Sequence, residues 1–151
     1  MTTNARPSTN PFLSTAAEEM HVPVAHHLRA TMRAKPWGQE LIYAAGTNGY
    51  VGKLITVMAG RSLSLQLHRH KDETITVVSG EALFESGPSA DDLEGTTMLA
   101  GDTVHVLPQV LHRITAVTDL LLAEVSTAGP GWEHDVVRLA DDYGRDGTSA
   151  P

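Results

Sequence analysis

Three histidines and one glutamate are the residues of this chain best suited to chemistry. One residue separates His68 from His70, and Glu73 and His112 follow further along the chain. Histidines at positions i and i+2 of a β-strand project from the same face, roughly 6–7 Å apart along the backbone, so both rings can approach one ion. Imidazole nitrogens and carboxylate oxygens are common ligands of divalent metals. The pattern therefore predicts a metal site made by His68, His70, Glu73 and His112.

The segment that carries the first two histidines alternates strictly, which predicts a β-strand from Arg61 to His70. One face of this strand carries leucines, and the other carries Ser62, Ser64, Gln66, His68 and His70. A lone His-x-His pair is more often exposed or structural. Here the metal interpretation is favoured because glycines and Pro108 fall where turns should flank the strands. The polar face must then either enclose something polar or meet solvent.

The rest of the chain from about residue 35 to residue 140 is predicted to form short strands. Ser79-Gly80 is a turn signal, and the segment from Gly87 to Gly95 is expected to be an acidic loop. Strands this closely spaced indicate a sandwich or a barrel. The clearest of them are predicted at residues 52–58, 74–78, 81–85, 103–107, 113–117 and 120–125.

The two ends of the chain are predicted to lie outside the barrel. Residues 1 to about 12 are polar and proline-containing, which is typical of disorder. Thr15 to Glu18 fits a capping box, and a helix is an option for residues 24–34 although Pro23 argues against one continuous helix. The predicted organisation is an N-terminal extension at 1–34, helical in a short part or disordered, a barrel at 35–146 and a disordered tail at 147–151.

Composition excludes several functional classes. The chain has 151 residues, which is typical of one domain, and it has no cysteine, so disulfides, thiolate zinc sites and cysteine nucleophiles are excluded. Its formal net charge of −7 disfavours nucleic acids and anionic membranes as partners. No apolar run approaches the roughly 20 residues of a membrane span, and the N-terminus lacks the apolar core of a signal peptide. We therefore expect a cytoplasmic protein with a small-molecule partner and, because small barrels leave strand edges exposed, a homodimer.

The two histidine-bearing blocks resemble the two conserved motifs of the cupin superfamily. The first combines Gly60 with His68, His70, Glu73 and Gly80, and the second runs from Gly101 through Pro108 to His112. The resemblance implies an all-β, cupin-type double-stranded β-helix, also described as a jelly-roll barrel. Two departures are visible: only two residues separate His70 from Glu73, and Val110 stands where many cupins have glycine.

A narrower resemblance, spanning about residues 35–146, is to the cupin domain of type II mannose-6-phosphate isomerases. It is carried by Lys35-Pro-Trp-Gly38, by the segment from Leu63 to His68, by Val77 to Gly80, and by segments around His112 and from Asp135 to Arg145. The resemblance makes Lys35, Trp37 and Arg145 candidate substrate-binding residues. It is specific for the fold and the metal site and much less so for the substrate.

Three functions are compatible with these features. The first is an isomerase that interconverts a phosphorylated aldose and ketose, with the metal as Lewis acid, Gln66 as a ligand or substrate contact, and Lys53 and Arg113 holding charge. The second is a metal-dependent tailoring enzyme of small-molecule or natural-product biosynthesis, and the third is a non-catalytic binding protein. Zinc is the first choice for a single divalent ion, and iron, manganese, cobalt and nickel also suit these ligands.

Overall fold

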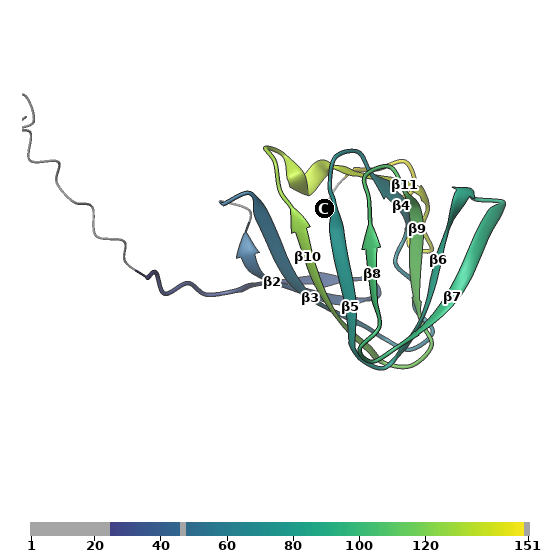
Figure 1. Cartoon of the computed structure of the whole chain (residues 1–151), viewed down its shortest axis with the longest axis horizontal. Coiled ribbons are helices and arrows are strands. Elements are labelled where there is room, and N and C mark those ends of the chain that lie inside the picture. Colours follow the sequence, from purple (N-terminus) through teal and green to yellow (C-terminus); the bar gives the residue numbers. More distant parts are fainter. Residues whose placement is uncertain (1–24, 46–47, 150–151) are drawn as a thin grey trace, which may run out of the picture.

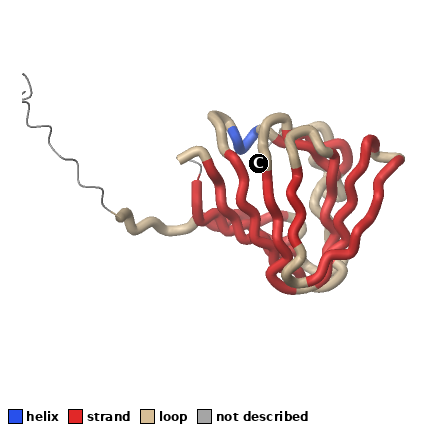
Figure 2. Tube along the Cα trace, in the orientation of Figure 1, coloured by secondary structure: helices blue, strands red, loops and turns tan. Residues whose placement is uncertain are grey.

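The chain folds into two antiparallel β-sheets that enclose a common interior (Figures 1 and 2). The structure is a computed structural model that describes residues 25–45 and 48–149. The prediction of an all-β protein is confirmed. The strands are β1 (Thr31–Lys35), β2 (Gly38–Ala45), β3 (Tyr50–Val57), β4 (Leu65–His68), β5 (Glu73–Ser79), β6 (Glu81–Ser89), β7 (Asp92–Leu99), β8 (Thr103–Val106), β9 (Leu111–Ala116), β10 (Leu120–Thr127) and β11 (Val136–Ala140).

Each sheet mixes strands that are distant in the sequence. One sheet has the order β1-β2-β3-β10-β5-β8, and the other has the order β11-β4-β9-β6-β7. A short 3₁₀ turn, η1 (Trp132–His134), links β10 to β11. As a result β4, β5 and β9, which carry three of the four predicted metal ligands, face one interior. Among the described residues no helix is long and apolar enough to cross a membrane.

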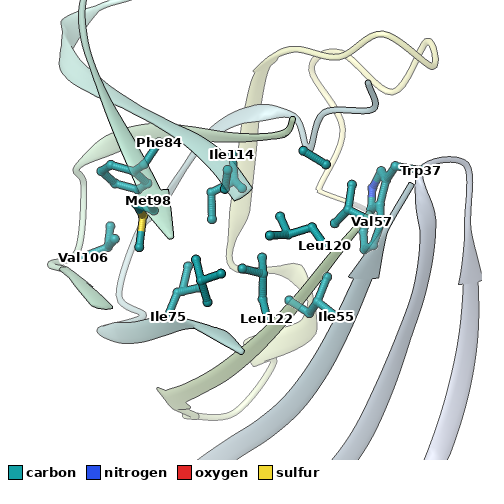
Figure 3. Close-up of a cluster of buried hydrophobic side chains, with 13 residues drawn as sticks. Trp37, Ile55, Val57, Ile75, Phe84, Met98, Val106, Ile114, Leu120 and Leu122 are labelled. Atoms are coloured by element: carbon teal, nitrogen blue, oxygen red, sulfur yellow. The ribbon is translucent and has the colours of Figure 1, made fainter. Parts of the chain in front are cut away.

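The interior is apolar along one part of each strand and polar along the next. On β10 the inward residues are Leu120 and Leu122, followed by Glu124 and Ser126, and all four are buried. β5 changes in the same way, from Val77 and Ile75 to Glu73, and β9 changes from Ala116 and Ile114 to His112. The apolar part is the core shown in Figure 3, with Trp37, Phe84 and Met98 among its members. The polar part is the place for chemistry.

The option of a helix over residues 24–34 is wrong. Residues 25–30 form neither helix nor strand, and residues 31–35 form the edge strand β1. β1 pairs with β2 in antiparallel register, from Thr31 opposite Ile42 to Lys35 opposite Gly38. These sheet hydrogen bonds override the helical preference of a short segment that contains Met, Arg, Ala and Lys. The sheet thus begins before the predicted boundary at Lys35, while the predictions for residues 1–24 lie outside the described residues.

The predicted acidic loop from Gly87 to Gly95 is also wrong, because most of it belongs to the β6–β7 hairpin. Ser86 pairs with Glu94 and Ser89 pairs with Asp92, with an irregularity between the two pairs. Gly87 permits this close approach, since a Cβ there would lie 1.9 Å from the carbonyl oxygen of Asp92. Acidic and glycine residues indicated a loop, but long-range pairing determined the structure.

Gly80, in the predicted Ser79-Gly80 turn, is expected to tolerate replacement poorly. Its φ is +93°, and a Cβ there would lie 2.3 Å from the carbonyl oxygen of Asp119. Gly101 is a matched control, because its φ is +98° but a Cβ added there would meet no atom within 4 Å. In urea denaturation Gly101→Ala should cost about 1–2 kcal/mol, the penalty of a left-handed backbone, and Gly80→Ala should cost distinctly more. Equal losses would contradict the close approach.

Candidate metal centre and its cavity

His68, Glu73 and His112 converge in the polar part of the interior. One ligand atom from each lies within 4.8 Å of the others, and all three residues are buried. Oε1 of Glu73 lies 3.1 Å from Nε2 of His112 and 3.7 Å from Nε2 of His68. Ligands that share one ion with bonds near 2.0–2.1 Å stand roughly 3.0–3.4 Å apart. Only a small adjustment therefore separates these donors from metal-binding geometry.

Two neighbouring strands of one sheet, β4 and β9, and β5 of the other sheet position the three donors. His68 is the last residue of β4, Glu73 is the first residue of β5 and His112 is the second residue of β9. The β4–β9 pairing places Gln66 opposite His112. The backbone oxygen of Val110 accepts a hydrogen bond from Nδ1 of His112 at 2.9 Å, which leaves the lone pair of Nε2 for the centre.

The electrostatics favour the metal-binding protonation states of His68 and Glu73. Burial, followed by the nearby Lys71 ammonium, lowers the pKa of His68 to about 4, so its imidazole is neutral at neutral pH. Burial alone would raise the pKa of Glu73. Lys71 and the two histidines outweigh burial and hold the pKa of that carboxyl well below its ordinary value. The result is a neutral imidazole beside an anionic oxygen, the form in which both residues ligate metals.

An unsatisfied oxygen shows that the cluster fits a metal ion. Oε1 of Glu73 is buried and has no hydrogen-bond partner, although buried carboxylate oxygens normally have one. A cation between this oxygen and the two Nε2 atoms would satisfy it. Gln66 can complete the set, because its side-chain amide lies 3.5 Å from Nε2 of His68. Its other amide atom meets the hydroxyl of Ser64, which both donates and accepts, so either atom can face the ion.

His70 does not join the group that the structure brings together. The predicted strand from Arg61 to His70 is in fact shorter, because β4 ends at His68. The chain then turns, and the Oδ2 of Asp135 accepts hydrogen bonds from the backbone N–H groups of His70 and Lys71 at 3.1 and 2.8 Å. The period-2 argument fails beyond the end of a strand. His70 is exposed and borders a different hollow, which it shares with Trp132.

His68 connects the donor cluster to a cavity that is rich in cations. His68 and Gln66 line this cavity, where six basic side chains accompany only three carboxylates. A cationic cavity in a chain of net charge −7 is a local feature that favours an anionic ligand. The basic residues are Arg33, Lys35, Lys53, Lys71, Arg138 and Arg145, and the carboxylates are Glu40, Glu124 and Glu133.

A row of alternating charges crosses the inner face of the β1–β8 sheet. Nζ of Lys71 lies 2.5 Å from Oε2 of Glu73 and 2.8 Å from Oε1 of Glu124. Lys53 then lies 3.6 Å from Oε1 of Glu124 and 3.7 Å from Oε1 of Glu40, and Glu40 reaches Lys35 at 3.5 Å. Burial would lower the pKa of Lys71, but Glu124 and Glu73 outweigh burial and raise it. Lys71 is therefore a permanent cation beside the metal-type donors.

The remaining predicted residues fall into two groups. Lys35, Lys53 and Arg145 line the cavity, as does Trp37, which is only 3% exposed and belongs mainly to the core. Arg113 neighbours His112 on β9 and so faces the opposite side. Its guanidinium holds Glu85 in two contacts of 2.8 and 3.0 Å.

Arg145 lies in a turn that hydrogen bonds to Asp141 hold together. Oδ2 of Asp141 accepts hydrogen bonds from the backbone N–H groups of Tyr143 and Arg145 at 3.2 and 3.0 Å. The Arg145 guanidinium makes two further contacts with the same carboxylate, and Tyr143 packs against the core. This turn brings a cation from the end of the chain to the cavity.

Sequence reasoning missed three important residues of this site. Lys71 and Glu124 are buried beside the donors, and Trp132 forms part of the cavity wall with Lys53 lying 5.8 Å from its ring centroid. Glu124 had a readable signal: it continues the inward series of Leu120 and Leu122, so a charge stands on the buried face of a strand. Lys71 had none, because the turn that buries it is set by the distant Asp135.

The two-sheet barrel and the donor cluster at its polar end define a cupin. The matching family model, Mannose-6-phosphate isomerase C-terminal, covers residues 21–141, and the chain belongs to this family. The xanthan biosynthesis protein XanB of Xanthomonas campestris pv. campestris is 34% identical over 113 residues, which are 74% of this chain and 23% of that protein. The chain thus spans less than a quarter of the length of such curated relatives.

Solved structures agree on the fold. The capsular polysaccharide assembling protein CapF of Staphylococcus aureus matches with a TM-score of 0.65 at 15% identity, over 76% of this chain and 33% of that chain. Oxalate decarboxylase of Bacillus subtilis, a protein with Mn(II) centres, matches with a TM-score of 0.58 at 22% identity, over 70% of this chain and 29% of that chain. At these identities the likeness establishes the cupin fold alone.

Proposed function

We propose that this chain is a metal-dependent cupin enzyme that interconverts a phosphorylated aldose and the corresponding ketose. The observation that carries the proposal is the contact between the donor cluster and the cationic cavity: His68 lines that cavity, and Lys71, one of its six basic side chains, contacts Glu73. An open-chain sugar phosphate offers neighbouring oxygens for a metal at one end and a dianion for basic residues at the other. The membership in the mannose-6-phosphate isomerase C-terminal family supports the same reaction.

Each part of the cavity has a task in this proposal. The resident cation, for which zinc is our first choice, would be held by His68, Glu73 and His112, with Gln66 as a fourth ligand, and would polarise the sugar carbonyl. Lys53 supplies positive charge for an enediolate oxygen. Arg113 is not used, because it is not among the residues that line this cavity.

The far end of the cavity binds the phosphate in this proposal. Lys35 and Arg145 line the cavity together with Arg33, Arg138 and Trp132. Burial lowers the pKa of Lys35, and Glu40 partly opposes that shift. A phosphate beside Lys35 would strengthen its protonated form, so substrate binding and the charge of this lysine support each other.

The direct test is turnover of mannose 6-phosphate by the metal-loaded protein. We expect fructose 6-phosphate to appear, detected by a coupled enzymatic assay or by NMR, and we expect His112→Ala to remove the activity. Absence of turnover together with absence of binding of any phosphosugar would end the proposal. Binding without turnover, or oxygen consumption by an iron-loaded form, would favour a tailoring enzyme instead. The homodimer stays a prediction that light scattering can test.

A further inference from the structure

Glu124 is a buried carboxylate of the cavity that metal binding does not require. It lies on β10, its residue is 5% exposed, and it shares the cavity wall with Gln66, His68 and Lys71. It also lines a second, smaller hollow together with Glu73 and His112. A carboxylate is therefore held on the cavity side of the donor cluster without being one of the three grouped donors.

The two oxygens of Glu124 have different environments. Oε1 lies 2.8 Å from Nζ of Lys71 and 3.6 Å from Nζ of Lys53, and it accepts a hydrogen bond from the Ser126 hydroxyl at 3.4 Å. Oε2 makes no hydrogen bond with any described residue, since both hydrogen bonds of this carboxylate are accepted by Oε1. Two lysines and a serine thus fix the carboxylate through one oxygen, while the other oxygen keeps its lone pairs for a ligand.

Lys71 fixes the distance between this carboxylate and the donor cluster. Its ammonium contacts both Oε1 of Glu124 and Oε2 of Glu73, at 2.8 and 2.5 Å. The Lys71 ammonium therefore bridges Glu73, a proposed metal ligand, and Glu124, which lies outside the donor cluster. A substrate whose carbonyl and hydroxyl oxygens face the donors would place the carbons between those oxygens close to Glu124.

We propose that Oε2 of Glu124 carries the proton between carbons 2 and 1 of the sugar, an inference that rests on the proposed function. Starting from the aldose, the C2–H bond breaks as an O–H bond forms on Glu124. The electron pair of the broken C2–H bond forms the C1=C2 double bond, and the carbonyl π pair moves to O1. Glu124 returns the proton to C1, and the hydroxyl proton on O2 passes to O1. No oxidant or other reactant is needed.

The other carboxylates of the cavity are less suited to this role. Glu40 holds Lys53 with one oxygen and Lys35 with the other, at 3.7 and 3.5 Å. Glu133 is paired with Arg33, and both groups are partly exposed. Among the described carboxylates that line the cavity, Glu124 combines burial, proximity to the donors and an oxygen that accepts no hydrogen bond from a described residue.

The test is exchange of the C2 hydrogen of mannose 6-phosphate in D₂O, followed by NMR with metal-loaded protein. Glu124→Gln should slow this exchange by about 10²–10⁴-fold, the usual contribution of a proton-transfer residue. Bound metal per chain, and the calorimetric affinity for the phosphosugar, should stay within a few-fold of wild type. Glu94→Gln, the same change on exposed β7, should leave the exchange unchanged.

The outcomes separate this inference from the proposed function. Exchange in the wild type that disappears in Glu124→Gln with metal and phosphosugar still bound supports both. Exchange that survives in Glu124→Gln overturns the role of Glu124 and leaves the isomerase proposal standing. A wild type that binds the phosphosugar but shows neither exchange nor conversion to fructose 6-phosphate overturns both. If the wild type converts the sugar without exchange, the variants are compared by the rate of conversion. Glu124→Asp is a second variant that guards against a folding defect, because its shorter carboxylate should restore part of the exchange. If Glu124→Asp is folded but exchanges no faster than Glu124→Gln, the result counts against the proton-transfer role of Glu124.

Discussion

The melting temperature of the wild-type chain should rise when a divalent ion is added, and Glu73→Gln should lose most of that rise. An ion at 100 times its dissociation constant stabilises the folded state by about 2.7 kcal/mol. For a domain of this size that corresponds to a rise of roughly 5–11 °C. Glu73 supplies the only anionic donor of the grouped residues, and Oε1 has no hydrogen bond that would hold it elsewhere. A neutral amide cannot replace it.

The measurement is a thermal melt with and without zinc, after treatment with a chelator. Glu94→Gln is the matched control, since it makes the same chemical change on the exposed face of β7 and should retain the full zinc-dependent rise. If Glu73→Gln keeps that rise, the bound ion lies elsewhere in the chain.

Lys71→Met should destabilise the metal-free protein by about 3–5 kcal/mol, the usual effect of removing one partner from a buried ion pair. Lys71 is buried, and its ammonium is the closest cation to both Glu73 and Glu124. Methionine matches its length but leaves two carboxylates facing each other in the interior. Arg69→Met, two residues away and exposed, should change the stability by no more than about 0.5 kcal/mol.

The effect of Lys71→Met should depend on pH in a definite direction. In the wild type Lys71 helps hold the pKa values of Glu73 and Glu124 below the ordinary value, despite the opposing effect of burial. Their contribution to stability is therefore present above the unfolded pKa of about 4.3 and is lost as the pH falls through the lowered folded values. Without Lys71, burial should raise the pKa of at least one carboxyl, and stability is then lost as the pH rises.

The stability difference between the wild type and Lys71→Met should consequently narrow on acidification from about pH 8 to about pH 5, the range over which a carboxyl with a raised pKa takes up its proton. Urea denaturation in the presence of a chelator measures it at each pH. A difference that stays constant, or one below about 1 kcal/mol at the alkaline end, would mean that the two carboxylates do not depend on Lys71.

All three donors that the structure groups can be identified in the sequence from residue type and spacing. His68, Glu73 and His112 lie on strands whose alternation is visible in the sequence, and the β4–β9 register brings two of those strands together. His70, predicted from the same pattern, lies outside the grouped donors, because the alternation continues past His68 whereas the strand does not. The hydrogen bonds from Asp135 that end the strand come from 65 residues further along the chain, and no local pattern reports them.

The cationic cavity is only partly predictable for a similar reason. Lys35, Lys53 and Arg145 are candidates from the sequence, but Arg33 and Arg138 join them only because the edge strands β1 and β11 complete the two sheets. The sequence allows a helix at β1 because local propensity dominates such short segments when the pairing partner is unknown. Strands are easier to find where part of the inward series is apolar, as with Leu120 and Leu122 on β10 and Ile55 and Val57 on β3, because burial leaves a period of two in the sequence.

The most direct test of the centre is elemental analysis of zinc-loaded protein after gel filtration, comparing His70→Ala with His112→Ala. The geometry predicts one ion per chain in the wild type and in His70→Ala, and strongly reduced zinc in His112→Ala. A wild type without bound zinc, iron, manganese, cobalt or nickel, or a His70→Ala variant that loses its ion as completely as His112→Ala, would contradict a centre built on His68, Glu73 and His112.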